Sequence, residues 1–331
     1  MTDDSIIQTI MNNAVNAGAI FSQLDQEHTD RIVKAVYKAA FNNRIKLAQM
    51  AVDETKMGRF EDKVIKNVIA TQLVYDDIKN VKTVGIISDD EVSGITEIAQ
   101  PLGPIFAITP VTNPTSTVIF KILIALKTRN TIIIRPHSNA VNCSIEAAKI
   151  CYEAALSEDA PENCIQWIPS CTREETQKMM AHKDMALILA TGGGGLVNAA
   201  YSSGTPALGV GAGNVPVFIE KSADIKYAVS QIMSSKLFDN GTVCASEQAI
   251  IVEKDIAELV KQELESLGGY FMNPEETAKV SAVVFDSVKK VMSTVIMGKT
   301  AKFIADLAGI TIPLKAELLI APLDGVGEKY P

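Results

Sequence analysis

The sequence predicts an α/β protein with a Rossmann-like, doubly wound parallel sheet, followed by an incomplete second α/β domain. Two observations carry this prediction. From Pro104 onward, short apolar runs alternate with helical segments, and their starts lie roughly 20–35 residues apart, the room that a parallel βαβ crossover needs. These runs are also apolar on both faces, as expected for strands that helices cover on two sides.

The first hundred residues are predicted to be mainly helical and to end in a hairpin. Apolar residues recur at helical spacing over 32–52, and the pattern resumes over 61–79 after an interruption at Gly58. Over about 84–103 the pattern alternates as in a hairpin, with Gly94 as a breaker.

One sheet is predicted over about 104–220, with helices between its strands. Thr172 and Glu175 form an S/T-x-x-E capping box, which marks one of these helix starts. The expected strands are IFAIT from 105, TIIIR from 131, CIQWI from 164, MALILAT from 185 and VPVFIE from 215.

A change of pattern follows this sheet. Ser222 is predicted to cap a helix with an apolar stripe over 225–233, and the DNGT turn at 239–242 ends it. Cys244 comes directly after the turn, and a strand, further helices and ELLIAP follow.

Length and composition bound the class of protein. The 331 residues, 47% hydrophobic and 21% charged, are typical of a globular chain of about two domains. We expect a first domain over 1–238, made of N-terminal helices and a Rossmann-like sheet, and the start of a second domain, which carries Cys244, over 239–331. A net charge of -8 and the lack of a Lys/Arg cluster argue against nucleic acid as a partner.

Other classes are excluded by simple signals. No apolar run approaches the roughly 18–20 residues of a membrane span, and MTDDSIIQTI lacks the basic region of a secretory signal. The five cysteines form no C-x-x-C pair, and the three histidines are widely scattered, so no metal site is expected. The sequence therefore predicts a soluble, cytoplasmic enzyme.

Two glycine-rich loops are candidate ligand sites. TGGGG (Thr191–Gly195) follows a predicted strand and precedes a helix, where a nucleotide can approach backbone N–H groups. It is not the G-x-G-x-x-G fingerprint, so a tight structural turn is the alternative. GVGAGN (Gly209–Asn214) precedes a strand, and a bulged turn and a ligand contact stay equally open there.

The thiols differ in their predicted surroundings. Cys143, Cys151 and Cys164 lie in apolar helix or strand patterns and are predicted to be core residues. Cys171 comes directly before a helix start, where backbone amides lower the pKa of a thiol. Cys244 follows a glycine turn and can face a cleft. Spacing favours Cys244 over Cys171, and a chain without a catalytic cysteine remains the alternative.

Three further residues are candidates for site chemistry. Asn113 follows the first strand of the sheet, at the edge where open α/β sheets bind ligands. Its amide is suited to donating to an oxyanion, but asparagine before proline is commonly a turn residue. His137 lies just past a strand end, so it is either a cofactor contact or an ordinary surface residue. Glu247 is a weak candidate for a base, because it falls within a predicted strand.

Several stretches resemble the CoA-acylating aldehyde dehydrogenases of the aldehyde dehydrogenase superfamily. ILATGGGGLVNAAYSSGTPALGVGAGN and FDNGTVCASEQ carry this resemblance, and TNPTSTVIFKILIALKTRN and MGRFEDKVIKN are similar to the same subfamily. The greatest likeness is to the N-terminal half of bifunctional aldehyde–alcohol dehydrogenases, over nearly the whole chain. The resemblance implies the aldehyde dehydrogenase fold, NAD as cofactor, coenzyme A as co-substrate and a homo-oligomer of the full-length protein.

The resemblance also assigns residues. Cys244 matches the nucleophile, which sets Cys171 aside, and Asn113 matches the asparagine that holds the oxyanion together with the Cys244 backbone N–H. No acid stands near Arg135 to select a free ribose 2′-hydroxyl, so NAD is favoured over NADP by the subfamily alone. The positions that match cofactor contacts are Ile108, Thr109, Pro110, Val111, Thr112, Asn113, Arg135, His137, Ser138, Thr191, Gly192, Gly193 and Gly211.

The implied reaction converts a short aldehyde, with acetaldehyde favoured, into an acyl-CoA through a thioacyl group on Cys244. Hydrolytic relatives carry a glutamate base in a Leu-Glu-Leu-Gly-Gly segment, but the matching loop 207–214 has no acidic residue. Coenzyme A is therefore expected as the acyl acceptor. The alternatives are succinate semialdehyde or propionaldehyde as substrate, or a non-catalytic nucleotide-binding or assembly fragment.

One departure from the superfamily concerns the C-terminal region. The superfamily's catalytic domain continues past the position of Pro331, with a Glu-Lys-Leu-Ser-Pro-like segment that reaches the nicotinamide ribose and a strand that completes the oligomer. We therefore expect a C-terminally truncated chain that binds cofactor weakly and has little activity alone.

Overall fold

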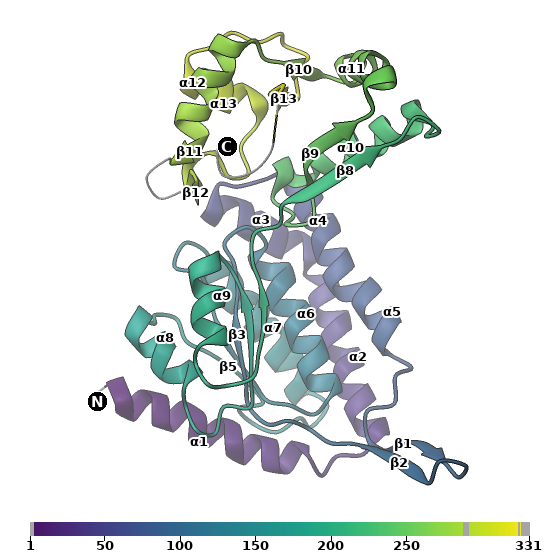
Figure 1. Cartoon of the computed structure of the whole chain (residues 1–331). Coiled ribbons are helices and arrows are strands. Elements are labelled where there is room, and N and C mark those ends of the chain that lie inside the picture. The colour runs from purple at the N-terminus through teal and green to yellow at the C-terminus, as the bar shows by residue number, and fades with distance from the viewer. Residues whose placement is uncertain (1–2, 287–290, 324, 326–331) are drawn as a thin grey trace. The chain divides into compact units, whose positions relative to one another are not determined.

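The computed structural model describes residues 3–286, 291–323 and 325 (Figure 1). Contacts within the chain divide it into two compact units. The first unit contains Met1–Lys56 and Phe60–Ala212, and the second contains Met57–Arg59 and Gly213–Pro331. Each unit is described by itself.

The first unit begins with helices, continues into a hairpin and then alternates strands with helices, as the sequence predicts. Its helices are α1 (Asp3–Phe21), α2 (Gln26–Asn42), α3 (Arg44–Thr55), α4 (Phe60–Val68), the π-helical turn η1 (Ile69–Leu73), α5 (Val74–Ile78), α6 (Pro114–Lys127), α7 (Val141–Leu156), α8 (Arg173–Met180) and α9 (Gly194–Tyr201). Its strands are β1 (Gly85–Asp90), β2 (Ile95–Ala99), β3 (Ile105–Ile108), β4 (Ile132–Arg135), β5 (Ile165–Trp167), β6 (Leu187–Thr191) and β7 (Ala207–Val210).

The central sheet of this unit is parallel, with the strand order β5-β4-β3-β6-β7. The chain proceeds from β3 to β5 in one direction and then returns to add β6 and β7 on the other side of β3. The strand order therefore reverses between β3 and β6, which is the position where open α/β sheets bind ligands. The predicted doubly wound architecture is confirmed.

Helices cover both faces of the sheet (Figure 1). Helices α2, α6 and α7 pack on one face in a core that includes Ile122, Leu126 and Ile132. Helices α1, α8 and α9 cover the other face, where Phe106 and Ile188 point. All four residues of β3 are buried, which explains the apolar character of IFAIT on both faces.

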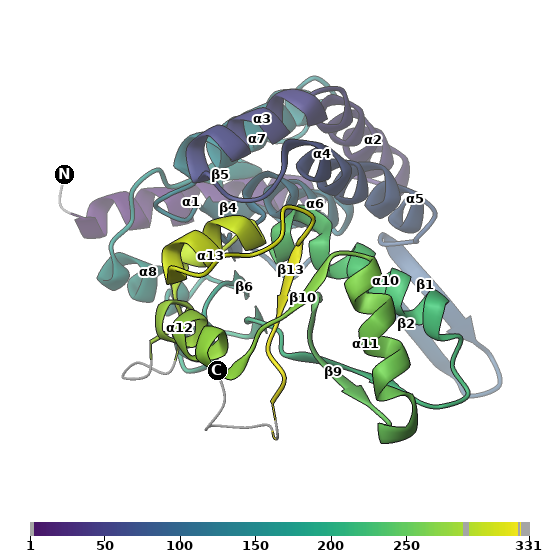
Figure 2. The same cartoon turned by 90° about the horizontal axis from the view of Figure 1, so that it is seen from above.

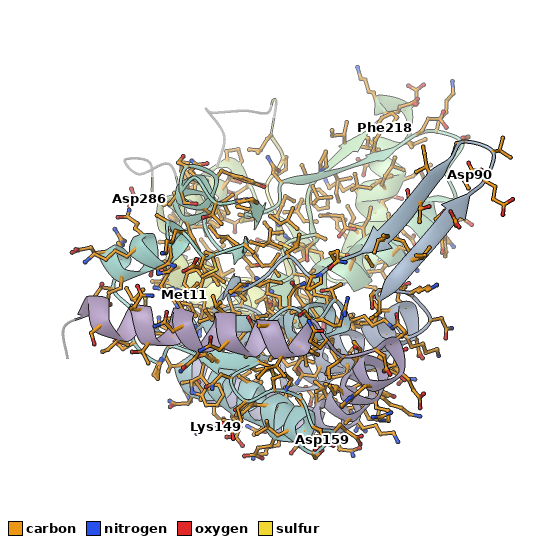
Figure 3. The ribbon with its side chains drawn as sticks, turned by 90° about the horizontal axis from the view of Figure 1, so that it is seen from below. Met11, Asp90, Lys149, Asp159, Phe218 and Asp286 are labelled. Atoms are coloured by element: carbon orange, nitrogen blue, oxygen red, sulfur yellow. The ribbon has the colours of Figure 1, made fainter. Side chains whose placement is uncertain are left out.

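The hairpin β1–β2 is antiparallel and exposed along most of its length. Asp90 lies at its far end (Figure 3). Among the described residues, no helix combines the length and the apolar character that crossing a membrane requires.

The second unit is built from smaller sheets and helices. Its elements are β8 (Val215–Ile219), α10 (Ile225–Leu237), η2 (Phe238–Gly241), β9 (Glu247–Val252), η3 (Lys254–Ile256), α11 (Ala257–Ser266), β10 (Gly269–Phe271), α12 (Pro274–Val284), β11 (Phe285–Asp286), β12 (Val291–Met292), η4 (Thr294–Ile296), α13 (Ala301–Ala308) and β13 (Leu318–Ile320). Strand β10 pairs in parallel with β13, and α12 packs beside α13 (Figure 2).

Two local predictions for this region are wrong. VPVFIE does not extend the first sheet, because β8 pairs in parallel with β9 and the edge of that sheet is formed by β7. Ser222 does not cap α10, because the side chain of Asp224 accepts the N–H of Tyr227 instead. Together with their pairing, β8 and β9 belong to the second unit, as does α10, because the contacts divide the chain before Gly213.

Candidate active site

The loops that carry the predicted cofactor contacts meet at one edge of the first unit's sheet. Ile108 is paired with Arg135 on one side and with Ala190 on the other, and Thr191 is paired with Val210. Because the strands are parallel and in register, their carboxyl ends share an edge. The structure therefore brings together the predicted loops over 108–113, 135–138, 191–193 and at Gly211.

This edge has both unpaired polar atoms and open space. The Thr109 Oγ1 and Arg135 Nε atoms are buried without a hydrogen-bond partner among the described residues, and such orphaned groups call for a ligand or water. A Cβ added at Gly193 or Gly211 would meet nothing within 4 Å. Gly193 is also the N-cap of α9 and supplies no side-chain cap. The edge therefore fits an anionic dinucleotide, whose phosphates accept hydrogen bonds from a helix N-terminus.

His137 and its neighbours form one end of this edge. Burial and the nearby Arg135 guanidinium lower the pKa of His137, so its ring is neutral at pH 7. Its Nδ1 accepts the N–H of Asn139 at 3.1 Å, and Ser138 is exposed. The Arg135 Nη2 atom donates to the Cys171 carbonyl at 3.4 Å.

Asn113 precedes α6, but its side chain does not cap the helix. Its Oδ1 accepts from Lys66 Nζ at 2.6 Å, and its Nδ2 donates to Thr112 Oγ1 at 3.1 Å. Lys63 Nζ donates to the Thr112 carbonyl at 3.1 Å. A role as a turn residue alone does not explain these side-chain contacts of Asn113 and its neighbour. The sequence did not predict the contacts from Lys63 and Lys66 of α4.

Lys121 is a further buried lysine that sequence reasoning missed. Its Nζ donates to the carbonyls of Ile108 and Leu189, each at 2.8 Å, beneath the same edge. Burial lowers the pKa of Lys121 to about 7. The available signal was one lysine in the otherwise apolar run STVIFKILIALK.

The cysteines separate by exposure. Cys143, Cys151 and Cys164 are buried, as predicted, and burial raises the pKa of both Cys151 and Cys164 to about 12. Cys171 is half-buried, and its Sγ lies 3.3 Å from Thr176 Oγ1. Cys244 is exposed. Among the five thiols, Cys244 is therefore the one that a substrate reaches most readily.

The turn before Cys244 is held by a buried carboxylate. Asp239 and Asn240 both adopt left-handed backbone angles, with φ of 51° and 53°. The Asp239 side chain is fully buried and accepts hydrogen bonds from the Arg59 N–H at 2.6 Å and the Thr242 hydroxyl at 2.5 Å. Left-handed backbone is unfavourable for residues other than glycine, so this turn depends on the contacts around it. Strained turns of this kind are common at functional sites.

The backbone of Cys244 also lies close to Gly213, within the second unit. A Cβ at Gly213 would lie 1.9 Å from the Cys244 carbonyl oxygen, so only glycine permits this approach. Glu247 begins β9, as its strand pattern predicts, and its Oε2 is buried without a hydrogen-bond partner among the described residues.

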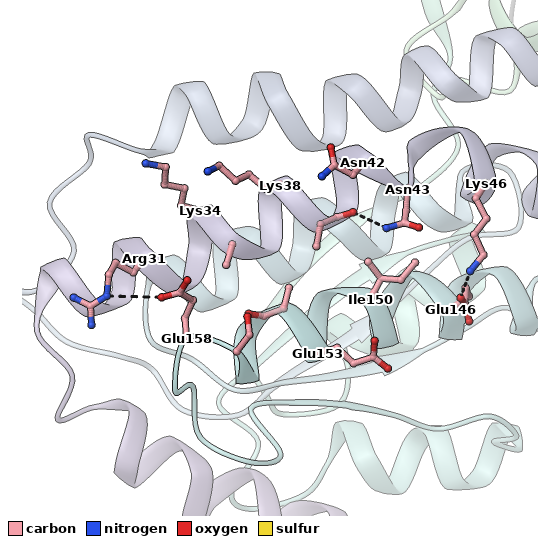
Figure 4. A pocket seen from close by; sticks show the side chains of 14 residues that line it. Arg31, Lys34, Lys38, Asn42, Asn43, Lys46, Glu146, Ile150, Glu153 and Glu158 are labelled. Carbon is pink, nitrogen blue, oxygen red and sulfur yellow. Dashed lines mark hydrogen bonds and ion pairs between the residues drawn. The ribbon is translucent and has the colours of Figure 1, made fainter.

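A groove with a volume of about 860 Å³ lies elsewhere in the first unit, between α2 and α7 (Figure 4). Ion pairs cross it from Lys46 to Glu146 at 2.6 Å and from Arg31 to Glu158 at 3.9 Å. It contains none of the predicted site residues. Within the described part of the chain, no cluster of three His, Cys, Asp or Glu side chains is arranged to hold a metal ion.

The first unit has the parallel α/β sheet that is typical of dinucleotide-binding proteins. The second unit carries an exposed thiol, which is a candidate nucleophile. Comparison with known proteins agrees with this class. The model of the aldehyde dehydrogenase family matches residues 2–314, and the chain belongs to that family.

The similar proteins include an acetylating enzyme and a structure solved with bound CoA. Aldehyde-alcohol dehydrogenase 2 of Entamoeba histolytica is 48% identical over 313 residues, which are 92% of this chain and 36% of that protein. An acetylating aldehyde dehydrogenase from Geobacillus thermoglucosidasius is 47% identical, with a TM-score of 0.95 over 99% of this chain and 72% of that one. A Rhodopseudomonas palustris propionaldehyde dehydrogenase, solved with bound CoA and an acylated cysteine, is 28% identical, with a TM-score of 0.85 over 95% of this chain and 72% of that one.

The resemblance predicted from the sequence is thus confirmed at the level of the family and of its acylating members. The chain spans little more than a third of the length of its aldehyde-alcohol dehydrogenase relatives, 36% in the Entamoeba protein and 37% in an Escherichia coli one.

Proposed function

We propose that the chain provides the aldehyde-oxidising chemistry of a CoA-acylating aldehyde dehydrogenase. The observation that carries this proposal is the surroundings of Cys244. Its thiol is exposed, and its backbone approaches Gly213 closely. The segment 207–214, which contains Gly213, has no carboxylate. This combination supplies a nucleophile without a base in that segment to activate water.

In the proposed reaction, the Cys244 thiolate attacks the carbonyl carbon of the aldehyde and a tetrahedral alkoxide forms. The amide of Asn113 and the backbone N–H of Cys244 act as hydrogen-bond donors to this oxyanion. A bound nicotinamide supplies the hydride acceptor. The acyl group then remains on Cys244 as a thioester until the thiol of coenzyme A attacks it, and the Cys244 thiolate leaves as acyl-CoA is released.

The residues at the sheet edge are proposed to bind the dinucleotide. Thr109 and Arg135 supply the buried orphaned atoms, and the N-terminus of α9 supplies backbone donors behind Gly193. NAD is the proposed cofactor, and its preference over NADP depends on the likeness to the acylating subfamily.

Acetaldehyde is the proposed substrate, in keeping with the acetylating name of the Geobacillus relative. Succinate semialdehyde and propionaldehyde are the alternatives. A homo-oligomer of the full-length protein and a cytoplasmic location are also part of the proposal.

The decisive measurement is product analysis with aldehyde and NAD, with and without coenzyme A. We expect NADH formation to depend on coenzyme A and the product to be a thioester. Cys244→Ala should abolish turnover and leave cofactor affinity nearly unchanged, whereas the matched Cys171→Ala variant should behave like the wild type. Rapid formation of the free acid without coenzyme A would contradict the proposed acceptor. Cofactor binding without any turnover would favour the non-catalytic alternative.

A further inference from the structure

The orientation of the Asn113 amide determines what this side chain is able to do. Its oxygen only accepts hydrogen bonds and its nitrogen only donates them. A donor to an oxyanion must therefore present Nδ2, and an amide turned by 180° would place an acceptor beside the developing negative charge. The two orientations are nearly equal in shape, so a neighbouring group has to select one of them.

Lys66 makes this selection in the structure. Its ammonium has three donors and no acceptor, and Nζ lies 2.6 Å from Asn113 Oδ1. A turned amide would bring its NH₂ group against the ammonium, which exchanges a charge-assisted hydrogen bond for a repulsion between donors. Lys66 therefore holds the amide oxygen on its own side and leaves Nδ2 on the other, where it contacts Thr112 Oγ1.

The burial of Lys66 is energetically unfavourable for the fold. Its residue is 7% exposed, and burying an ammonium group is unfavourable unless strong partners compensate it. Two neighbours on α4 act on the same loop. Lys63, which is 3% exposed, donates to the Thr112 carbonyl, and the Asn67 side chain accepts from Thr115 Oγ1 at 2.9 Å. Helix α4 thus holds the 112–115 segment through consecutive contacts.

We propose that Lys66 is a positioning residue for the oxyanion donor. It acts through Asn113, by fixing the direction of the amide and by polarising it, so that the N–H groups become stronger donors. This inference rests on the proposed function, because it gives Asn113 the role of an oxyanion donor. It adds that the donor depends on a buried cation from a helix 47 residues earlier in the sequence.

The test is a double-mutant cycle on turnover in the protein that contains this chain. Asn113→Ala should lower kcat by on the order of 10²–10³-fold, as expected for the loss of one oxyanion donor. Lys66→Met should lower kcat by on the order of 10-fold to 10²-fold, with little change in the KM for NAD. In the Asn113→Ala background, Lys66→Met should cause almost no further loss, because the group through which it acts is already gone. Lys66→Arg, which retains a cationic donor, should recover part of the activity.

Lys127→Met is the matched control. Lys127 is 2% exposed and pairs with Asp30 at 2.5 Å, but it is the last residue of α6, at the opposite end from Asn113. This variant should lose stability and keep its kcat, which separates the cost of losing a buried ammonium from the effect on the amide. Should Lys66→Met fail to fold, Lys66→Gln replaces it, and it should show an intermediate loss because a neutral amide selects the orientation less strongly.

The outcomes separate this inference from the proposed function. A wild-type protein that forms no thioester would overturn the proposed function and the role of Lys66 with it. An active wild type with unchanged kcat in a folded Lys66→Met or Lys66→Gln variant would overturn this inference alone. Losses that multiply fully in the double mutant would also overturn it, because Lys66 would then act independently of Asn113.

Discussion

Gly58 is the position where one methyl group should most directly disturb the turn before Cys244. It has a φ of +75°, and a Cβ there would lie 1.9 Å from Asp239 Oδ1. That oxygen accepts the N–H of Arg59, and the other oxygen of the same carboxylate accepts the hydroxyl of Thr242. Because Asp239 is fully buried, its carboxylate has no free volume into which to move.

Two effects determine the loss of stability in Gly58→Ala. The left-handed backbone costs an alanine about 1 kcal/mol. Displacement of the carboxylate from the Arg59 N–H removes a charge-assisted hydrogen bond, which is worth about 2 kcal/mol. We therefore expect the free energy of unfolding to fall by about 3 kcal/mol, a large share of the stability of an ordinary domain.

Gly309→Ala is the matched control for this prediction. Gly309 also lies in the second unit and has a φ of +66°, but a Cβ there would meet nothing within 4 Å. It should show the backbone cost alone, about 1 kcal/mol. Urea denaturation followed by far-UV circular dichroism measures both variants. Equal losses in the two would refute the reasoning, because the contact with Asp239 would then contribute nothing.

Two further predictions concern the thiols and the half-buried carboxylate of Glu54. Brief treatment with iodoacetamide should label Cys244 first and Cys171 more slowly, as detected by mass spectrometry. Preferential labelling of a buried cysteine would contradict these exposures. Burial raises the pKa of Glu54, but hydrogen bonds from Cys143 and Asn142 together lower it by more than burial raises it. The pKa of Glu54 is therefore below the ordinary value. The Glu54 carboxylate should therefore stabilise the fold at neutral pH. This contribution should disappear as the pH falls from the ordinary pKa of glutamate, about 4.3, through the lowered pKa of Glu54. Glu54→Gln should accordingly lower the urea midpoint at pH 7 and match the wild type in acid, and a difference that persists in acid would refute this.

The alternation of apolar runs and helical segments was sufficient to predict the order of elements in the first unit, because each βαβ step leaves a local pattern. It was not sufficient to predict which strands pair. VPVFIE has the stronger strand pattern, but ALGV, within the glycine-rich stretch, forms the edge strand β7. Pairing depends on contacts between segments that are distant in sequence, and neither hydrophobic periodicity nor local propensity reports those contacts.

The candidate site shows the same division. The place of Asn113 at a strand end follows from topology, and so does the shared edge with His137 and Gly193. The contact from Lys66 does not follow, because a lysine in an amphipathic helix is ordinarily a solvent-exposed residue. Only the packing of α4 against the loop after β3 makes this side chain part of the site.

The loop GVGAGN shows why a glycine motif cannot be interpreted as a single signal. Gly209 lies in β7, where a Cβ would lie 2.6 Å from Val197 and 2.9 Å from Tyr201, so it permits close packing of a helix on a strand. Gly211 has open space around it, which suits a ligand, and Gly213 allows the Cys244 carbonyl to approach. The sequence left a structural turn and a ligand contact equally open for this motif. The three glycines differ in their surroundings, and the division between the two units falls inside the motif, after Ala212. A ligand contact at Gly211 stays a prediction. Substitutions at these three positions should therefore have different effects. A side chain at Gly209 should disturb the packing within the first unit, one at Gly211 should occupy open space, and one at Gly213 should displace the Cys244 backbone in the second unit.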